Sequence, residues 1–289
     1  MRIYRIDHIG QSAPDLEAQV AKLERLFGFR RTLAWDGGVR LAVPGSWGQY
    51  WEVLERPGTR GGFDHVAAEV PDLAATRTEL ESHGIGVRET DGWLEAPLTP
   101  PKYGTGVPFR LRGPGSLALC GDQAAEPVAP QEVDGPTLGI VGLDHVCQAF
   151  GDRDELARAY AELAGFVQVW RTPLDEHPDM ADLVLNIPGS TICWEIIMPR
   201  GEDSFIDRFL ARNGPAVHHV TFQVADWGAA MAACEYHETP TFDDEDGITD
   251  GARWRHTFIH PKHAGGVLVQ LFWEERPGVW VRSDKIAPE

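Results

Sequence analysis

Four polar side chains interrupt strand-like apolar runs in the second half of the chain, and all four belong to residue types that bind metals. They are His145 in LDHVCQ, Glu195 in TICWEIIMP, His219 in VHHVTFQV and Gln270 in GVLVQLFW. An amide or carboxylate buried in such a run is costly unless it finds a partner. Two imidazoles, one carboxylate and one amide oxygen suit Mn, Fe, Co, Ni or Zn. The sequence therefore predicts a divalent transition-metal centre at these four positions.

The alternation within each run indicates which histidine faces that centre. Side chains alternate between the two faces of a strand, so His219 shares a face with Thr221 and Gln223. His218 shares the other face with two valines and a phenylalanine, which predicts a structural role against the helices. His145 shares its face with the small side chain of Cys147, which leaves room for a ligand.

The elements that must position these residues form a fourfold repeat. A histidine in a strand-like run is followed seven residues later by an aspartate in four segments, IDHIGQSAPD, FDHVAAEVPD, LDHVCQAFGD and HHVTFQVAD. The pairs are His8/Asp15, His65/Asp72, His145/Asp152 and His219/Asp226. A helical pattern follows each aspartate, whose carboxylate can accept the unpaired N–H groups of a first helical turn. Each aspartate is therefore predicted to be a helix N-cap.

Short β-rich runs separated by turn residues follow each predicted helix, so each module reads strand, helix, strand, strand, strand. Four such modules fill the chain and predict an α+β fold of tandem βαβββ modules, paired into two domains with curved mixed sheets. The boundaries expected are 1–123 and 137–276, joined by a Pro- and Ala-rich linker at 124–136 and followed by a tail at 277–289.

Composition limits the classes of partner. The formal net charge is −18, which argues against a nucleic-acid partner and does not exclude a small anionic substrate. The four cysteines form no CxxC pair, no signal peptide is evident, and no apolar run approaches membrane-spanning length. These features predict a cytoplasmic protein that acts on a small molecule, with no membrane partner and with a homodimer left open.

The repeated module and its ligand pattern resemble the vicinal oxygen chelate superfamily, which includes glyoxalase I, extradiol dioxygenases, fosfomycin-resistance enzymes and methylmalonyl-CoA epimerase. Within the second domain, VHHVTFQVAD and FIHPKHAGGVLVQL resemble methylmalonyl-CoA epimerases. The resemblance places the metal ligands on His145, Glu195, His219 and Gln270. That family usually has an amide at the first of the two non-histidine positions and a glutamate at the second. The two are exchanged here, which keeps the total ligand charge.

The exchange affects the expected proton-transfer groups. Gln270 cannot accept a proton, so the resemblance implies that the base is Glu195 or a residue of TPLDEHPDMADL. Asp175, Glu176, His177 and Asp179 lie in that segment, and Glu176 is the residue we expect. An apolar lining is available from Trp170, Met180, Trp194 and Trp254, although each is more readily explained as a core or rim residue than as a substrate contact.

The first domain carries part of the same pattern. His8, Glu52 and His65 are present, and they define a second candidate metal site of the two-His-one-carboxylate type. The fourth position is expected in GPGSLALCGD, near Leu119 or Cys120, where no oxygen ligand stands. Alternatively, these residues are relics that support the fold.

Three functions follow from the resemblance. The first is a metal-dependent epimerase or isomerase that removes a proton α to a carbonyl through a metal-stabilised enolate, acting on an acyl-CoA thioester or a sugar or cyclitol ketone. The second is an Fe(II)-dependent extradiol-type dioxygenase. The third is a non-enzymatic binding or resistance protein.

Overall fold

The computed structural model describes residues 1–99, 106–114, 126–174, 177–201, 203–249 and 251–276. The first half contains β1 (Arg5–Ala13), α1 (Leu16–Arg25), β2 (Arg30–Trp35), β3 (Gly38–Ala42), β4 (Tyr50–Glu55), β5 (Gly62–Glu69), α2 (Leu73–Ser82), β6 (Arg88–Thr90), β7 (Trp93–Pro97) and β8 (Pro108–Arg112). The second half contains β9 (Ile140–Ala149), α3 (Arg153–Ala164), β10 (Val167–Arg171), β11 (Met180–Asn186), β12 (Cys193–Pro199), α4 (Phe205–Asn213), β13 (Val217–Val224), α5 (Trp227–Tyr236), β14 (Thr241–Thr249), β15 (Ala252–Ile259), η3 (Pro261–His263) and β16 (Val269–Glu274).

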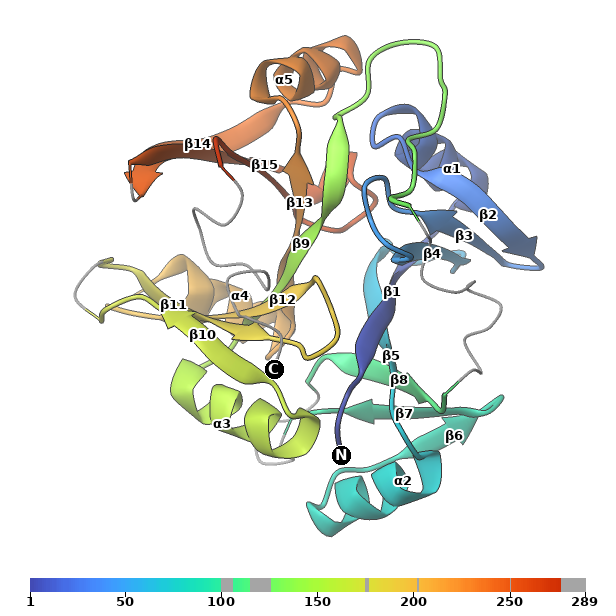
Figure 1. The fold of residues 1–289 in the computed structure, drawn as a ribbon, viewed down its shortest axis with the longest axis vertical. Helices are drawn as coiled ribbons and strands as arrows, with labels where there is room; N and C mark the ends of the chain where they lie inside the picture. The colour runs from blue at the N-terminus through green and yellow to red at the C-terminus, as the bar shows by residue number, and fades with distance from the viewer. Residues whose placement is uncertain (100–105, 115–125, 175–176, 202, 250, 277–289) are drawn as a thin grey trace.

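Each half forms one eight-stranded mixed sheet, and the two halves lie side by side (Figure 1). The strand orders are β2-β3-β4-β1-β5-β8-β7-β6 and β10-β11-β12-β9-β13-β16-β15-β14. In each sheet the central pair is antiparallel, and parallel pairs flank it on both sides. The identical orders confirm the predicted α+β fold of four βαβββ modules joined in pairs. The helix α4 is an addition to the third module.

The repeated aspartates begin the helices as predicted. The carboxylates of Asp15, Asp72, Asp152 and Asp226 each accept a hydrogen bond from the backbone N–H three residues later, at 2.8–3.0 Å. Each aspartate has an extended backbone conformation, as an N-cap requires. The spacing of seven residues is therefore the distance along the chain from a histidine on a strand to the N-cap of the helix that follows that strand.

One large hydrophobic core extends across both sheets, and a small separate cluster of Cys147, Ala149, Ile197 and Ile206 lies in the second half. The ring of Phe222, on β13, lies 6.0 Å from Phe27 and 5.5 Å from Phe29, which follow α1 in the first half. In the reciprocal contact, Phe109 on β8 of the first half lies 6.4 Å from Tyr160 on α3 of the second half. The helix region of each half thus packs against a strand of the other half.

Polar contacts also join the halves. The Gln11 side chain on β1 donates to the carbonyls of Ala264 (2.8 Å) and Gly265 (3.0 Å), after η3, and its oxygen accepts from Trp51 Nε1 at 2.9 Å. The described part of the predicted linker bonds mainly to the first half, and its last residue, Pro136, has its carbonyl 2.8 Å from His237 Nε2 of the second half. Val128 exchanges backbone hydrogen bonds with residues 45 and 46, and Gln131 N–H bonds to Gly28 O at 2.9 Å.

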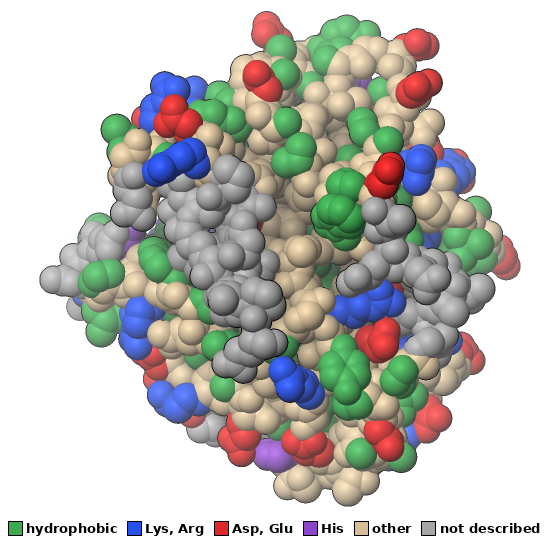
Figure 2. Space-filling model, in the orientation of Figure 1, with side chains coloured by type: hydrophobic (Ala, Val, Ile, Leu, Met, Phe, Trp, Pro, Cys, Tyr) green, Lys and Arg blue, Asp and Glu red, His purple; other side chains and the backbone are tan. Residues whose placement is uncertain are grey.

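On the face shown in Figure 2, Lys and Arg side chains are scattered among Asp and Glu side chains. Within the described residues, no helix is long and apolar enough to cross a membrane.

Candidate metal centre

The four predicted ligands lie on neighbouring strands and face the same side of the second sheet. In the backbone register, Cys147 on β9 pairs with Glu195 on β12. On β13, Thr221 pairs both with His145 and with Gln270 on β16. The donor atoms of His145, Glu195 and His219 all lie within 4.8 Å of one another.

The central donor atoms of this cluster are buried and unpaired. Glu195 Oε2 lies 3.4 Å from the Nε2 atoms of both His145 and His219. In the described part of the chain, neither Glu195 Oε2 nor His219 Nε2 has a hydrogen-bond partner, and the two residues are only 6% and 5% exposed. Unpaired buried acceptors are costly, and a shared cation satisfies both. The residues present therefore fit a divalent metal.

Neighbouring groups fix the orientation of the donors. His145 Nδ1 is 2.8 Å from Asp144 Oδ1, so its Nε2 faces the centre. The Thr221 hydroxyl lies 2.8 Å from that Nε2 and donates to Gln270 Oε1 at 2.7 Å. Carboxylates behind ligating imidazoles commonly set the tautomer in this way.

The electrostatics of the cluster favour a positive charge at its middle. Burial lowers the pKa of His145, but Asp144 and Glu195 outweigh it and raise that pKa to about 10. Burial lowers the pKa of His219 well below its usual value, despite Glu195, so this imidazole is neutral. Burial alone raises the pKa of Glu195, yet the two histidines hold it below its usual value. His219 and Glu195 are thus in the neutral and ionised forms that bind metals, and a divalent ion would take the place of the proton on His145 Nε2.

Glu195, His219 and Gln270 line a cavity of about 670 Å³, whereas His145 lies behind them. Apolar side chains including Trp170, Met180 and Trp254 line it. Trp194 does not: because Glu195 faces the cavity, its neighbour faces the core, where it is fully buried against Tyr160. Of the two readings of Trp194, as lining or as core, the structure therefore supports the core.

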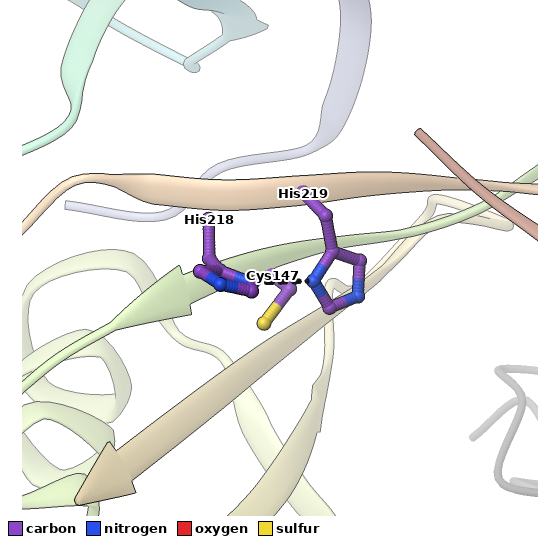
Figure 3. Close-up of side chains that lie close together, drawn as sticks. All are labelled: Cys147, His218 and His219. Carbon is purple, nitrogen blue, oxygen red and sulfur yellow. Dashed lines mark hydrogen bonds between the residues drawn. The ribbon is translucent and has the colours of Figure 1, made fainter. Parts of the chain in front are cut away.

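His218 packs against Phe209 and Phe205 of α4, with ring centroids 4.9 and 5.9 Å away, as its predicted structural role requires, and it also lines this cavity. The register of β13 against β9 shifts between Val217 and His219, which marks a bulge. A bulge interrupts side-chain alternation, so two consecutive histidines reach the same region. Figure 3 shows His218 and His219 beside Cys147, with their Nδ1 atoms 2.9 Å apart. Burial and the charge of Glu195 raise the pKa of the Cys147 thiol, which disfavours a thiolate ligand there.

Two polar groups of the cavity wall were not predicted. Asp182, on β11, is 3% exposed, and its Oδ1 accepts a hydrogen bond from Thr172 at 2.6 Å. Burial, followed by the charge of Glu195, raises the pKa of Asp182 to about 7. His256, on β15, accepts a hydrogen bond from Gln270 Nε2 at 3.2 Å and lies 3.2 Å from Glu245. An acidic residue inside the apolar stretch ADLVLN was the available signal for Asp182.

The predicted proton-transfer segment reaches the cavity in part. His177 and Asp179 line it. Asp175 and Glu176 lie outside the described residues.

In the first sheet, His8, Glu52 and His65 also come together, with donor atoms within 4.8 Å of one another. The expected fourth position, near Leu119 or Cys120, lies outside the described residues, and the strand assignment behind it was wrong. The strand in the place of β16 is β8, on which Arg110 pairs with Ala67 as Gln270 pairs with Thr221.

Comparisons with known proteins agree with this fold. Residues 144–258 match the Glyoxalase/Bleomycin resistance protein/Dioxygenase superfamily. The mitochondrial methylmalonyl-CoA epimerase of Mus musculus is 30% identical over 158 residues, which cover 54% of this chain and 85% of that protein.

Two solved structures match nearly the whole chain. The Mn(II)-bound glyoxalase from Novosphingobium aromaticivorans has a TM-score of 0.61 at 13% identity, covering 94% of this chain and 82% of its own. A mutant of 4-hydroxymandelate synthase from Streptomyces coelicolor has a TM-score of 0.67 at 14% identity, covering 99% and 97%. The relatives are enzymes, and the sequence match and the shared fold together show that the chain belongs to the glyoxalase/bleomycin resistance protein/dioxygenase superfamily.

Proposed function

We propose that the protein is a metal-dependent epimerase or isomerase that removes a proton α to a carbonyl. The observation that carries this proposal is the buried, unpaired pair of atoms Glu195 Oε2 and His219 Nε2 at the wall of an apolar cavity. The similarity to methylmalonyl-CoA epimerase supports an epimerase-like activity.

His145, Glu195, His219 and Gln270 would hold the metal, whose Lewis acidity lowers the pKa of a proton α to a coordinated carbonyl. The apolar cavity wall keeps water from the reacting groups. Gln270 would contribute a neutral amide oxygen to the metal. An amide is not a base at ordinary pH, so Gln270 cannot remove a proton from a substrate.

Another side chain must therefore move the proton. Glu195 and Glu176 remain our sequence-based candidates, and the cavity adds Asp182. This carboxylate faces the cavity beside Glu195 and is held by Thr172, while its burial shields it from bulk water. A buried carboxylate within reach of the substrate is the type of group that acts as a general base.

Two substrate classes fit this chemistry, an acyl-CoA thioester and a sugar or cyclitol ketone. The named epimerase relative supports the thioester. Both classes present a carbonyl with an acidifiable α-proton, so one assay covers them.

The first test is metal content, measured by elemental mass spectrometry on wild type, His219→Ala and Gln270→Ala. We expect one divalent ion per chain, lost in His219→Ala. The metal-loaded protein should then exchange α-protons of acyl-CoA thioesters or ketones for deuterium, as followed by NMR. Asp182→Asn should keep the metal and slow the exchange by about 100-fold or more.

The alternative functions give different results. Oxygen consumption with catechols by the Fe(II)-loaded protein, without α-proton exchange, would indicate an extradiol-type dioxygenase. A chain that binds no metal after reconstitution would instead be a small-molecule binding protein, and the epimerase proposal would fail.

A further inference from the structure

We infer that the first-half centre of His8, Glu52 and His65 is not a metal site, because Arg40 and Arg110 supply the positive charge that the second half takes from a metal. This inference concerns the other sheet and does not depend on the reaction proposed above.

The two arginines occupy register positions that hold uncharged residues in the second half. Arg40 on β3 pairs with Glu52, whereas Val184 on β11 pairs with Glu195. Arg110 on β8 stands where Gln270 stands on β16. The backbone is repeated, and only the side chains differ.

Arg40 engages the carboxylate that a metal would need. Its Nε and Nη2 atoms lie 2.9 and 2.5 Å from Glu52 Oε1. The other oxygen, Oε2, lies 3.1 Å from His8 Nε2. Arg40 and Glu52 are 7% and 6% exposed, so this ion pair is shielded from water.

The histidines direct their ring nitrogens at each other and at Arg110. His65 Nδ1 is 2.8 Å from Asp64, so that nitrogen donates and Nε2 carries the lone pair. That lone pair faces His8 Nε2 at 3.0 Å and Arg110 Nη1 at 3.5 Å. All three potential ligand atoms of this centre therefore face a donor or acceptor at 3.0–3.1 Å. Among the described residues, by contrast, Glu195 Oε2 and His219 Nε2 make no hydrogen bond, and Glu195 Oε2 approaches the Nε2 atoms of His219 and His145 only to 3.4 Å.

Arg110 is itself held in place. Its Nε donates to Glu95 at 2.9 Å, and Nη2 is 3.7 Å from Asp64. Glu95 pairs with Arg110 in the first sheet, and Phe258 pairs with Gln270 at the same place in the second sheet. The first half thus has an acidic residue opposite its arginine, where the second half has an apolar residue opposite its glutamine. A guanidinium does not lose its proton in proteins, so its repulsion of a second cation cannot be relieved by pH.

The test removes the arginines and installs the residues of the second half. All variants carry His219→Ala, which silences the second centre. The parent, which carries His219→Ala alone, should bind no Mn²⁺ by elemental analysis. Arg40→Val with Arg110→Gln should bind one equivalent, and adding His65→Ala should abolish it. Glu95 keeps Arg88 as a partner in the double variant. Arg31→Gln, which breaks only exposed ion pairs with Glu17 and Glu24, is the matched control and should bind none.

A second readout detects binding without relying on retention through purification. Added Mn²⁺ should raise the melting temperature of the double variant and leave that of the parent unchanged. The inference is overturned if the parent holds an ion that His65→Ala removes. It is also overturned if the double variant folds, by circular dichroism, and gains no ion. Should the double variant not fold, the parent and its His65→Ala derivative still decide the question.

Discussion

Gln270 is held at both ends of its amide by the protein. Its oxygen accepts from Thr221, and its nitrogen donates to His256, whose other nitrogen faces Glu245. This chain of contacts fixes which end of the amide is an acceptor toward the centre. A glutamine that were free to turn by 180° would present N–H groups to a metal as often as its oxygen.

Replacing His256 with phenylalanine should therefore weaken metal binding by about 10- to 100-fold, the range typical of groups that orient metal ligands. A competition titration with a fluorescent chelator measures the affinity, and the visible spectrum of the Co²⁺ form reports the ligand set. His177→Phe, which removes an exposed cavity histidine, is the control and should change neither. Equal affinities for wild type and His256→Phe would show that Gln270 needs no such support.

The four candidate ligands were predictable because each is a polar residue in an apolar strand, where a partner is required. The presence of His218 and Asp182 in the cavity wall and the position of Arg110 were not. The direction of the His218 side chain depends on a bulge, which strict alternation along a strand cannot reveal. The place of Arg110 depends on which strand pairs with β5. Both are set by tertiary register, which one sequence specifies only through the complete sheet.

At the scale of elements, the repeated aspartate is the feature that the sequence predicted best, because N-capping is local. The Asp152 carboxylate accepts from Glu155 N–H, and α3 ends at Gly165 in the left-handed conformation. A cap depends on a few neighbouring residues, so its signal survives in the sequence without knowledge of the fold.

Asp152→Ala should lower the free energy of unfolding by about 1 kcal/mol, because the helix loses the acceptor for a first-turn N–H. Asp152→Asn keeps an acceptor and should cost much less. Urea denaturation followed by far-ultraviolet circular dichroism measures both. If the two variants were equally destabilised, the charge of Asp152 rather than its capping bond would be responsible.

At the scale of the whole molecule, the halves share a core rather than meeting as separate domains. The strands of each sheet come from one half of the chain, but side-chain packing crosses between the sheets through Phe222, Phe27 and Phe29. The sequence could not show this, because each half carries enough apolar residues to account for a core of its own.

We expect one cooperative unfolding transition, with equal calorimetric and van't Hoff enthalpies. Phe222→Ala should lower the free energy of unfolding by about 3–5 kcal/mol while keeping a single transition, since the cavity it leaves is open to both halves. Differential scanning calorimetry tests both statements. Two resolved transitions in wild type would show instead that the halves fold independently.

The linker has a consequence for how the chain is connected. Its described part hydrogen-bonds to the first half through Val128 and Gln131, and the bonds from Gln11 to Ala264 and Gly265 do not involve it. Cutting the backbone within the linker after Gln131 removes a covalent tether and none of the contacts that join the two sheets. We therefore expect that, expressed as two polypeptides divided within the linker, the pieces assemble into the same molecule, with the fusion serving to fix their stoichiometry and raise their local concentration.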